Sequence, residues 1–505
     1  NLEIIPTVTG RRTEARPAGP SGPFVTTEER AEAGVTVRWG VTPNVSLNAA
    51  VNPDFSQVEA DAARLDVNTR FALFFPEQRP FFLEGRDFFE TPLALVFTRT
   101  VADPLAGAKL TGKQGRHAFG AFVAQDRINN LVLPGSQGSS LTTIDEEVSS
   151  GVLRWRRDVG EASTFGLLYT GREGESGYRN HLAGIDGLYR FRDSDSLRFQ
   201  LVGSTTRYPD ELALRFGQPT GDFAGHTLLA SYQHVDADWA WTADYAEVHP
   251  EFRADAGFIP RVGIQRGSAG IERRFRGGDD RWYSNLFLFL GVDGTREYDG
   301  AWNEWGADLV FFYQGPLQSF VRVGLAPNQE FFDGVTYHNF RQGLSGGFQP
   351  SGSLEAELGV SWGETIDFAN RRAADFVETS LELEFFAGRR VEGELELDRQ
   401  VFDVAGGELF TLDIAQTRLV YHFNLRTFLR TILQYRQIDR DPALYTFPVA
   451  ADDEELLTQL LFSYKLNAQS VVLVGYSDNH AGRGPLDLTQ TDRTVFFKIG
   501  YAWLR

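Results

Sequence analysis

The sequence contains no cysteine and no methionine among its 505 residues. Without cysteine, the chain has no disulfide framework, no zinc–thiolate site and no cysteine nucleophile. A chain without cysteine also suits passage through an oxidising compartment in the unfolded state. Because methionine is absent too, we expect the numbered chain to begin after processing or truncation, with any export signal already removed.

Long hydrophobic runs and an excess of positive charge are missing as well. No run of 18 apolar residues is present, which excludes a helical transmembrane protein. Asp and Glu outnumber Lys and Arg by 68 to 49, which gives a formal net charge of −19. Because phosphate binding needs clustered Lys and Arg, this balance argues against nucleic acid as a partner.

The sequence is instead rich in segments that alternate between apolar and polar residues. In residues 353–362, Leu354, Leu358 and Trp362 share one face, whereas Glu355 and Glu357 share the other. A soluble sandwich shows the same alternation, so the period alone does not decide the fold class. The same period of two recurs in residues 301–314, 317–325, 375–386, 391–398, 425–436 and 494–505.

Three further features favour an outer-membrane barrel. Tight turns alternate with longer loops such as residues 127–147 and 439–453, as short periplasmic turns and external loops do. Many strands span about 10 to 15 residues, which suits a tilted bilayer crossing. Aromatic residues such as Trp282 and Trp503 lie near strand ends, where interfacial girdles fall. We therefore predict an all-β fold, a single large closed antiparallel transmembrane β-barrel over residues 1–505.

The predicted barrel has about 24 to 26 strands and contacts outer-membrane lipid and lipopolysaccharide. The higher number requires residues 1–10 and 66–75 to be strands, while residues 11–30 are expected to form a loop. Strand parity then places residues 76–91 at the periplasmic end and residues 52–65 at the external end. The side chains predicted to face lipid are Leu354, Leu358, Trp362, Leu381, Leu383, Leu395 and Leu397.

Residues 52–91 interrupt the strand pattern. Pro53, Pro76 and Pro80 each remove a backbone donor, so no continuous helix or central strand can run through the segment. Bulky rings alternate there with charges of both signs, which is unusual for an exposed loop. We predict that residues 52–91 fold into or across the lumen, although an ordinary long surface loop is the alternative. The charges expected to pair with a charged wall are Glu77, Arg79, Glu84 and Arg86.

Acidic residues gather on the face predicted to line the lumen. Glu355, Glu357, Glu378, Glu382, Glu384, Glu392, Glu394, Glu396 and Asp398 fall on three consecutive strands, whereas Arg426, Arg430 and Arg436 fall two strands further on. We predict a transverse field and a preference for cations, and a solvated inner face without selectivity is the alternative.

No metal site is predicted from the sequence. Asp54, Glu59 and Asp61 could supply carboxylate oxygens to calcium, but they lack the spacing of an EF-hand. Capping, turn and lumen hydrogen bonds are the favoured roles for these three side chains. The acidic run at residues 452–455 is most simply a solvated loop, and bridging of lipopolysaccharide through divalent ions is the minor option.

No catalytic constellation is evident either. None of the eight histidines belongs to an HExxH motif, and no GxSxG or P-loop sequence is present. We therefore expect no enzyme activity and no cofactor, and we predict a gated or plugged channel for small solutes. A structural or docking barrel that anchors a periplasmic or surface protein, or a missing N-terminal domain, is the alternative. A TonB-dependent receptor is less favoured, because no plug domain of the usual size precedes the first strand.

Five motifs carry a family resemblance. They are VNPDF (51–55), QVEAD (57–61), FFPEQRPFFLEG (74–85), AGAKLTGK (106–113) and GFIPR (257–261). Together they resemble the signature of the DUF5916 family of bacterial outer-membrane β-barrel proteins, whose function is uncharacterised. Members often carry an N-terminal β-sandwich like a carbohydrate-binding module, which has no counterpart here. The resemblance implies a barrel in the outer membrane, and it brings no reaction or ligand.

Overall fold

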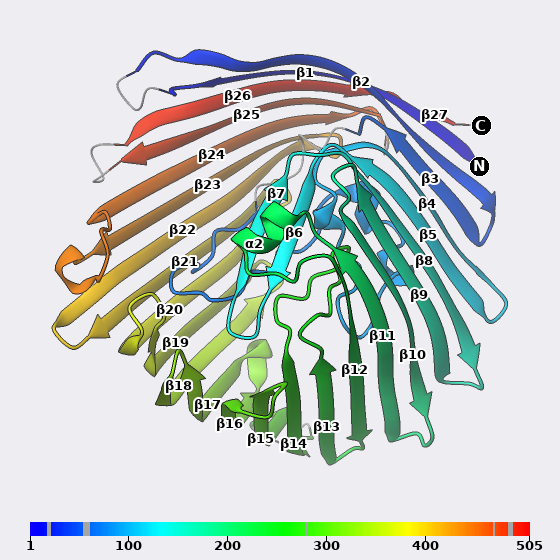
Figure 1. Cartoon of the computed structure of the whole chain (residues 1–505). Helices are drawn as coiled ribbons and strands as arrows, with labels where there is room; N and C mark the ends of the chain where they lie inside the picture. The colour runs from blue at the N-terminus through cyan, green and yellow to red at the C-terminus, as the bar shows by residue number, and fades with distance from the viewer. Residues whose placement is uncertain (18–21, 54–60, 279–280, 468–469, 483–487, 505) are drawn as a thin grey trace.

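The computed structural model describes residues 1–17, 22–53, 61–278, 281–467, 470–482 and 488–504. Most of them belong to one antiparallel sheet that closes on itself (Figure 1). The sheet holds 25 strands, and β27 (Trp503–Leu504) is a two-residue continuation of β26 (Thr489–Gly500) against the same neighbour. Within the described residues, 24 strands therefore form the wall. It closes where β1 (Leu2–Ala15) pairs with both β2 (Val25–Thr42) and β26.

The other strands of the wall follow one another in chain order. They are β3 (Val45–Val51), β4 (Pro104–Gln114), β5 (His117–Asp126), β8 (Val148–Val159), β9 (Ser163–Gly174), β10 (Arg179–Arg190), β11 (Asp195–Arg207), β12 (Asp222–Val235), β13 (Trp239–Val248), β14 (Ile264–Arg276), β15 (Asn285–Glu297), β16 (Trp302–Gln314), β17 (Phe320–Phe332), β18 (Val335–Ser351), β19 (Leu354–Asp367), β20 (Arg372–Ala387), β21 (Val391–Val404), β22 (Gly407–Asn424), β23 (Thr427–Arg440), β24 (Asp452–Lys465) and β25 (Val471–Gly482).

The remaining elements are short and lie in the connections. A separate hairpin joins β6 (Asn129–Pro134) to β7 (Ser139–Ile144). The helices are α1 (Pro80–Leu83), α2 (Asp210–Arg215), η1 (Arg86–Phe88), η2 (Thr98–Thr100), η3 (Pro316–Gln318) and η4 (Pro442–Leu444). No helix among the described residues is long and apolar enough to span a membrane.

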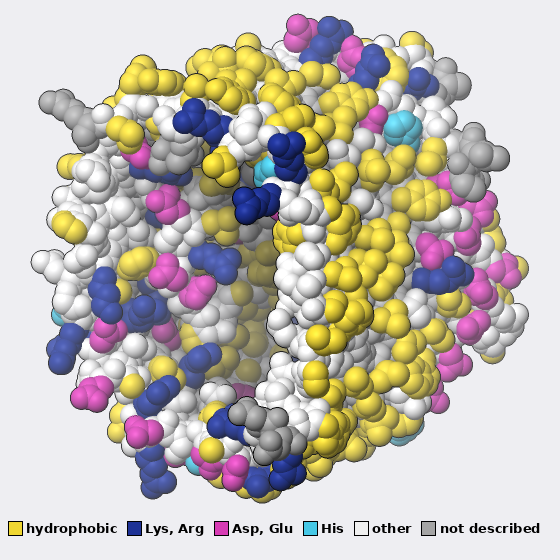
Figure 2. All heavy atoms as spheres, turned by 180° about the vertical axis from the view of Figure 1, so that it is seen from behind, with side chains coloured by type: hydrophobic (Ala, Val, Ile, Leu, Met, Phe, Trp, Pro, Cys, Tyr) yellow, Lys and Arg dark blue, Asp and Glu magenta, His cyan; other side chains and the backbone are white. Residues whose placement is uncertain are grey.

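Strand alternation gives the wall an apolar outer face and a polar inner face. Val123, Leu153 and Leu201 are exposed on the outside, whereas Lys109 and Gln200 on the opposite parity are buried. Figure 2 shows hydrophobic side chains gathered in a broad band over one side, with charged side chains around a hollow beside it. In hydrocarbon, every backbone N–H and C=O group must be paired within the protein. The closed sheet meets this requirement behind its apolar outer face.

The leucines predicted to face lipid lie on the outer face. Leu354, Leu358, Trp362 and Leu397 are exposed. The register aligns Leu358 with Leu381 and Leu397, and it aligns Leu383 with Leu395, so the partly covered leucines share that face. A one-residue slip would turn the whole set inward, which is why this pattern fixes the register.

Two expected boundaries are wrong. Residues 66–75 do not form a strand, because β3 and β4 already pair directly and leave no sheet edge for another strand. Residues 11–30 are not one loop, since β1 continues to Ala15 and β2 begins at Val25. Cross-strand charge pairs such as Arg11 with Glu28, 3.6 Å apart, accompany this extension of the sheet. The observed strand number is thus the lower of the two predicted.

Connections at the two rims of the barrel differ in length. Tight turns at residues 43–44, 115–116 and 352–353 lie at one rim, the end expected to be periplasmic. The other rim carries the long connections, namely residues 52–103, 127–147, 208–221, 249–263 and 441–451. Since β3 ends and β4 begins at the long-loop rim, the segment between them leaves and returns there. The predicted crossing to the periplasmic end by a strand at 66–75 is therefore wrong.

Candidate functional site: the insert and the inner wall

The insert comprises residues 52–103, described at 52–53 and 61–103. It runs inside the ring of strands in Figure 1 as an irregular chain with three short helical turns. Pro80 begins α1, where its missing N–H leaves no hydrogen bond unmade. Gly85 follows with φ of 65°, a left-handed conformation that glycine adopts without strain. The sequence thus favours a compact turn at this point over an extended strand.

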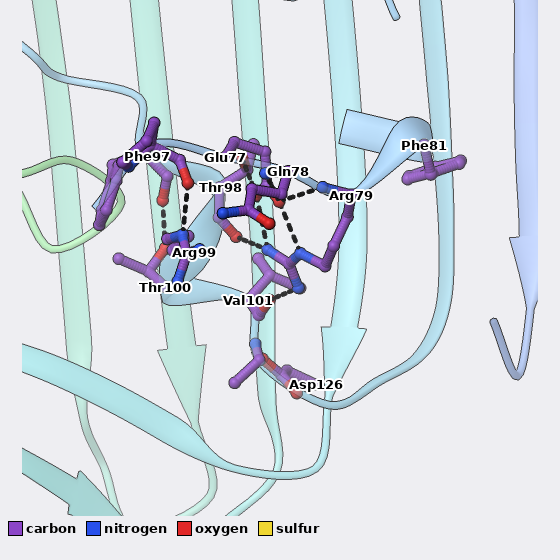
Figure 3. A network of polar contacts seen from close by, with 12 residues as sticks. Glu77, Gln78, Arg79, Phe81, Phe97, Thr98, Arg99, Thr100, Val101 and Asp126 are labelled. Carbon is purple, nitrogen blue, oxygen red and sulfur yellow. Dashed lines mark hydrogen bonds and ion pairs between the residues drawn. The ribbon is translucent and has the colours of Figure 1, made fainter. Parts of the chain in front are cut away.

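A buried ion pair organises the centre of the insert (Figure 3). The Arg79 guanidinium donates to both carboxylate oxygens of Glu77, at 2.8 and 2.7 Å, and both side chains are about nine-tenths buried. The Thr98 hydroxyl donates to the same carboxylate at 2.6 Å. Arg79 also donates to the carbonyls of Thr98 and Val101, at 2.8 and 2.6 Å, and lies over the Phe82 ring. These bonds tie residues 76–83 to residues 97–101.

The same contacts determine the ionisation of Glu77. Burial raises the pKa of its carboxyl, but the hydrogen bonds and charge of Arg79, together with the Thr98 hydroxyl, outweigh burial. The pKa of Glu77 is therefore held below its usual value. Glu77 is accordingly a fixed anion at neutral pH, neutralised by Arg79.

Apolar rings hold one side of the insert against the wall. Phe82 packs on Phe122 of β5 with ring centroids 5.9 Å apart, and the Phe89 ring fits against Gly120. Gly120 is required there, because a Cβ would lie 2.8 Å from the Phe89 ring. The buried cluster continues through Leu95, Val101, Val152, Leu168, Leu182, Val202, Val248, Phe252 and Ile264. Residues 82–101 are thus anchored on the inner face of β5 to β14.

Polar bonds reinforce this anchored side. The Lys109 ammonium on β4 donates to the carbonyls of Phe81, at 2.5 Å, and Glu84. Gln200 on β11 accepts from the Leu93 N–H at 2.9 Å. Thr111 lies beside Gly85 and is three residues from the end of β4, so this part of the insert approaches the short-turn rim. Residues 76–91 reach that end of the barrel as an irregular chain and not through a strand.

The opposite side of the barrel contacts the beginning of the insert. Gln434 on β23 donates to the Asp61 carbonyl at 2.8 Å, and Gln416 on β22 accepts from the Ala63 N–H at 3.3 Å. Asn68 donates to the Ile366 carbonyl on β19 at 2.7 Å. Residues 61–68 therefore contact β19, β22 and β23, and the described insert reaches both sides of the interior.

The predicted insert residues are paired in a different way from that expected. Glu77 and Arg79 pair with each other, and Arg86 lies 3.7 Å from Glu90 within the insert, so wall pairing is wrong for these three. Glu84 does meet a wall charge, with its carboxylate 3.5 Å from Arg38 of β2. The wall also supplies charges at other points of the insert, since the Glu330 carboxylate of β17 forms a buried ion pair with Arg70.

The three carboxylates considered for calcium do not form a described group. Asp54 and Glu59 lie outside the described residues. Asp61 forms a bidentate ion pair with Arg99, whose second nitrogen is 2.6 Å from the carboxylate, and it accepts from Gln78 at 3.3 Å. Arg99 therefore takes the place that a cation would occupy at Asp61.

The inner wall carries the predicted row of carboxylates. The register places Glu357 opposite Glu382 and Glu382 opposite Glu396, while Glu384 stands between Glu355 and Glu394. Carboxylate oxygens of Glu382, Glu394 and Glu396 lie within 4.8 Å of one another. The row concentrates negative charge on β19 to β21. Carboxylates this close together repel one another.

The ends of this row differ in their partners. Glu392 is 2.7 Å from Arg418 of β22, Asp398 stands opposite Ile414, and Glu378 accepts from Gln400 at 3.2 Å. Arg430 is buried in β23, and Arg436 pairs with Asp66 of the insert at 3.0 Å. Arg426 is not in the wall: it is exposed in the turn between β22 and β23, because β23 begins only at Thr427.

Several contact residues were not predicted from the sequence. Lys109 had a detectable signal, since it is the only charged residue in a run of small and apolar residues at 104–112. Arg99 and Arg38 are ordinary charges in the sequence. Gln416 and Gln434 carry no signal at all, because their partners lie more than 300 positions away in the chain.

Residues 2–115 match the family model DUF5916, which is described as a domain of unknown function. The likeness to this family thus covers the first 115 residues or so of the chain. This match confirms the resemblance found in the sequence. The matched residues include β1 to β4 and the entire insert. No curated protein matches the chain by sequence.

Solved structures resemble this chain in fold at very low identity. The copper transporter OprC matches with a TM-score of 0.51 and 10% identity, covering 99% of this chain and 81% of OprC. The match to the ferric enterobactin receptor PfeA covers 99% of this chain and 81% of PfeA, with a TM-score of 0.47 and 9% identity. The FrpB iron transporter from Neisseria meningitidis covers 79% of each chain, with a TM-score of 0.47 and 9% identity.

The likeness to OprC confirms the barrel fold. A closed antiparallel barrel with an apolar outer face is the form in which strands cross a membrane. This chain is thus an outer-membrane β-barrel, as predicted, and its outer face contacts outer-membrane lipid. Specific contact with lipopolysaccharide, and with a periplasmic or surface protein, stays a prediction.

Proposed function

We propose that this barrel transports small solutes and that the insert is a plug that must shift before a solute can pass. The observation that supports this proposal is the attachment of the insert to both sides of the interior, at β4 to β11 and at β19 to β23. A barrel of this strand number leaves a wide lumen unless something fills it. The proposal includes no catalytic activity.

The two attachments differ in strength, which suggests how the plug moves. The side at β4 to β14 combines bonds from Lys109 and Gln200 with a large buried cluster of aromatic and aliphatic side chains. On the side at β19 to β23, Ala63, Leu65 and Val67 pack against a smaller buried cluster, and the ion pair between Asp66 and Arg436 is partly exposed. Exposed ion pairs contribute little stability, so residues 61–68 are expected to detach first, before residues 76–101 leave the wall.

A docking role is the second candidate, and the long-loop rim favours it. The β6–β7 hairpin and α2 pack together through Leu131, Leu133, Tyr178, Tyr208 and Leu212. Both Tyr178 and Tyr208 donate to Asp255, at 2.8 and 3.0 Å, so the rim is a defined surface. Leu141 and Leu214 are exposed on these two elements and could contact a protein partner.

Single-channel recording in planar bilayers tests the transport proposal. Deletion of residues 76–89 should raise the conductance several-fold, because it removes the ring cluster from the lumen. Replacement of the same residues by an equal length of Gly and Ser is the matched control for specific packing, and we expect it to give frequent openings of intermediate size. Unchanged conductance in a deletion variant whose barrel is folded would contradict the plug.

A further inference from the structure

A groove of about 440 Å³ lies on the wall over β13 to β16. These four strands are neighbours in the sheet and lie side by side in Figure 1. Small residues and aromatic rings dominate its lining, namely Gly267, Ala269, Gly294, Tyr245, Trp302 and Trp305. The Trp302 ring covers Gly294, where a Cβ would lie 2.8 Å from it.

The parity of the strands shows that this groove opens toward the membrane. Ile271 and Leu290 are aligned with each other and are exposed on the outer face. Ala269 and Val292 are the next aligned pair of the same parity, and both line the groove. Because the outer face of the barrel contacts lipid, the groove is continuous with that lipid contact, and its occupant has apolar chains.

One cation lies on the outer side of the groove, near the long-loop rim. Arg296 is exposed, stands opposite Gln265 and Trp302, and donates from Nε to the Gln265 Oε1 at 2.7 Å. Among the described residues, Arg296 forms no ion pair. Arg266 also lines the groove, but it belongs to the inner parity and lies 3.5 Å from Asp293. The outer side therefore carries a positive charge without an anionic partner.

A carboxylate close to Arg296 is already bonded to other groups. Glu247 accepts from the Tyr298 and Tyr245 hydroxyls, at 2.8 and 2.9 Å. Gln265 donates to Glu247 at 3.3 Å while it accepts from Arg296. The amide of Gln265 thus stands between the two charges, and an anion from outside the chain can bind Arg296.

Arg296 lies at the level of lipid headgroups. Trp302 and Trp305 are exposed on the outer face beside it, and tryptophan gathers where hydrocarbon meets headgroups. The long-loop rim is the external end of outer-membrane barrels, so the headgroups at this level belong to the outer leaflet. Arginine is costly in hydrocarbon but binds phosphate through two parallel hydrogen bonds. The cation therefore favours a lipid with a phosphorylated headgroup.

The width of the groove favours a lipid with several acyl chains. Neighbouring strands are about 4.8 Å apart, so the four strands span about 14 Å. This width accommodates more than the two chains of a phospholipid. Lipopolysaccharide carries several acyl chains beneath one phosphorylated sugar headgroup, and it therefore matches both the width and the charge.

We propose that this groove binds one lipopolysaccharide molecule, with a headgroup phosphate on Arg296 and acyl chains along Gly267, Ala269 and Val292. The inference goes beyond transport, because it assigns a lipid site to the outer face. Neither conduction nor movement of the insert is required for binding.

Native mass spectrometry of the purified full chain in detergent tests the site. Phosphorylated hexa-acyl lipid A is the probe, and the same lipid A without phosphate is its control. We expect the phosphorylated form to bind at least about tenfold more tightly, which is about 1.4 kcal/mol. Equal binding of the two forms would overturn the proposal. Displacement of lipid A by an equal concentration of phosphatidylglycerol would overturn the assignment to lipopolysaccharide.

A pair of charge variants locates the phosphate. Arg296→Gln should weaken binding of phosphorylated lipid A about tenfold and remove most of its advantage over the form without phosphate, because a charge-assisted hydrogen bond is lost. Arg273→Gln is the matched control on the outer face of β14, since Arg273 lies near the short-turn rim and 3.3 Å from Asp238. The control should match the unmodified chain.

A pair of glycine variants locates the acyl chains. Gly267→Phe should weaken binding of both forms several-fold by filling the groove. A Cβ at Gly267 meets only the Asp244 carbonyl, at 4.0 Å, so the strand has room for a side chain. Gly203→Phe, at an equally open position on the outer face of β11, is the control. Lipid A binding that is unchanged by Arg296→Gln or by Gly267→Phe in a folded barrel would refute the assignment.

Discussion

Arg79 holds two parts of the insert together. Its guanidinium serves the Glu77 carboxylate, two backbone carbonyls and the Phe82 ring at once. Loss of one partner of a buried ion pair leaves the other charge desolvated and uncompensated. A substitution of Arg79 should therefore strongly destabilise the insert and leave the strands of the wall unchanged.

Arg79→Ala should destabilise the packing of the insert by about 3 kcal/mol, the usual cost of breaking a buried pair. Hydrogen exchange should increase in residues 76–101 and remain unchanged in the strands of the wall. Arg86→Ala is the matched control on the same segment, because its pair with Glu90 is mostly exposed and contributes less than about 1 kcal/mol. Equal effects from the two substitutions would contradict the central role of Arg79.

The ionisation of Glu77 makes the insert sensitive to acid. Its folded-state pKa lies below its unfolded value of 4.5, so the folded insert binds fewer protons. The stability contributed by this carboxylate is fully present above pH 4.5 and is lost as pH falls through the folded pKa. The chain has no cysteine, so a dye on Glu90→Cys can report the change. We expect a fluorescence transition below pH 4.5 that Glu77→Gln abolishes; a transition that persists in Glu77→Gln would assign it to another group.

Among the structural elements, strands were far more predictable than the insert. Alternation of apolar and polar residues identifies both faces of β19 to β21, because the side-chain period of a strand is local information. Proline and mixed charge identify an interruption at residues 52–91, but not its path. That path depends on bonds such as Asn68 to Ile366, whose partners no sequence pattern connects.

The position of η1 and α1 against β4 gives a direct test of the plug. A Cβ placed on Gly85 would lie 3.6 Å from the Thr111 Cβ, within the range for a disulfide. We expect Gly85→Cys/Thr111→Cys to crosslink under oxidation and to suppress the channel openings that require residues 76–91 to leave β4, with recovery on reduction. Each single-cysteine variant is a control for the change at its position. Openings that persist unchanged in the crosslinked barrel would contradict the movement of residues 76–91.

At the scale of the whole molecule, charge is distributed unevenly around the lumen. Carboxylates dominate β19 to β21, and basic side chains such as Arg430 and Lys498 lie where β23 to β26 meet β1 and β2. The sequence predicted the acidic row and its strands, because the alternation of side chains identifies the inward face and the composition of that face is acidic. The sequence did not predict that basic residues gather there, because these residues come from both ends of the chain and meet only when the barrel closes.

If removal of residues 76–89 opens the lumen, the acidic row should favour cations, since a negative corridor concentrates counter-ions. Reversal potentials in a salt gradient measure this preference. Neutralising Glu382, Glu394 and Glu396 together should lower the cation-to-anion permeability ratio several-fold. Neutralising the exposed turn residues Glu161, Asp193 and Asp238 should change it little. Anion preference in the deletion variant would contradict the acidic corridor.

Pairing of β1 with β26 also governs how this barrel is assembled. The hydrogen bond between Thr13 and Thr494, at 3.0 Å, joins residues 481 positions apart. Until that seam forms, both margins of a wide sheet present unpaired N–H and C=O groups, which invite pairing with other chains. Contacts between such distant residues also form slowly. Biogenesis therefore depends on keeping the nascent sheet from aggregating until its final strand is available, and kinetic protection during this interval is a requirement built into the topology.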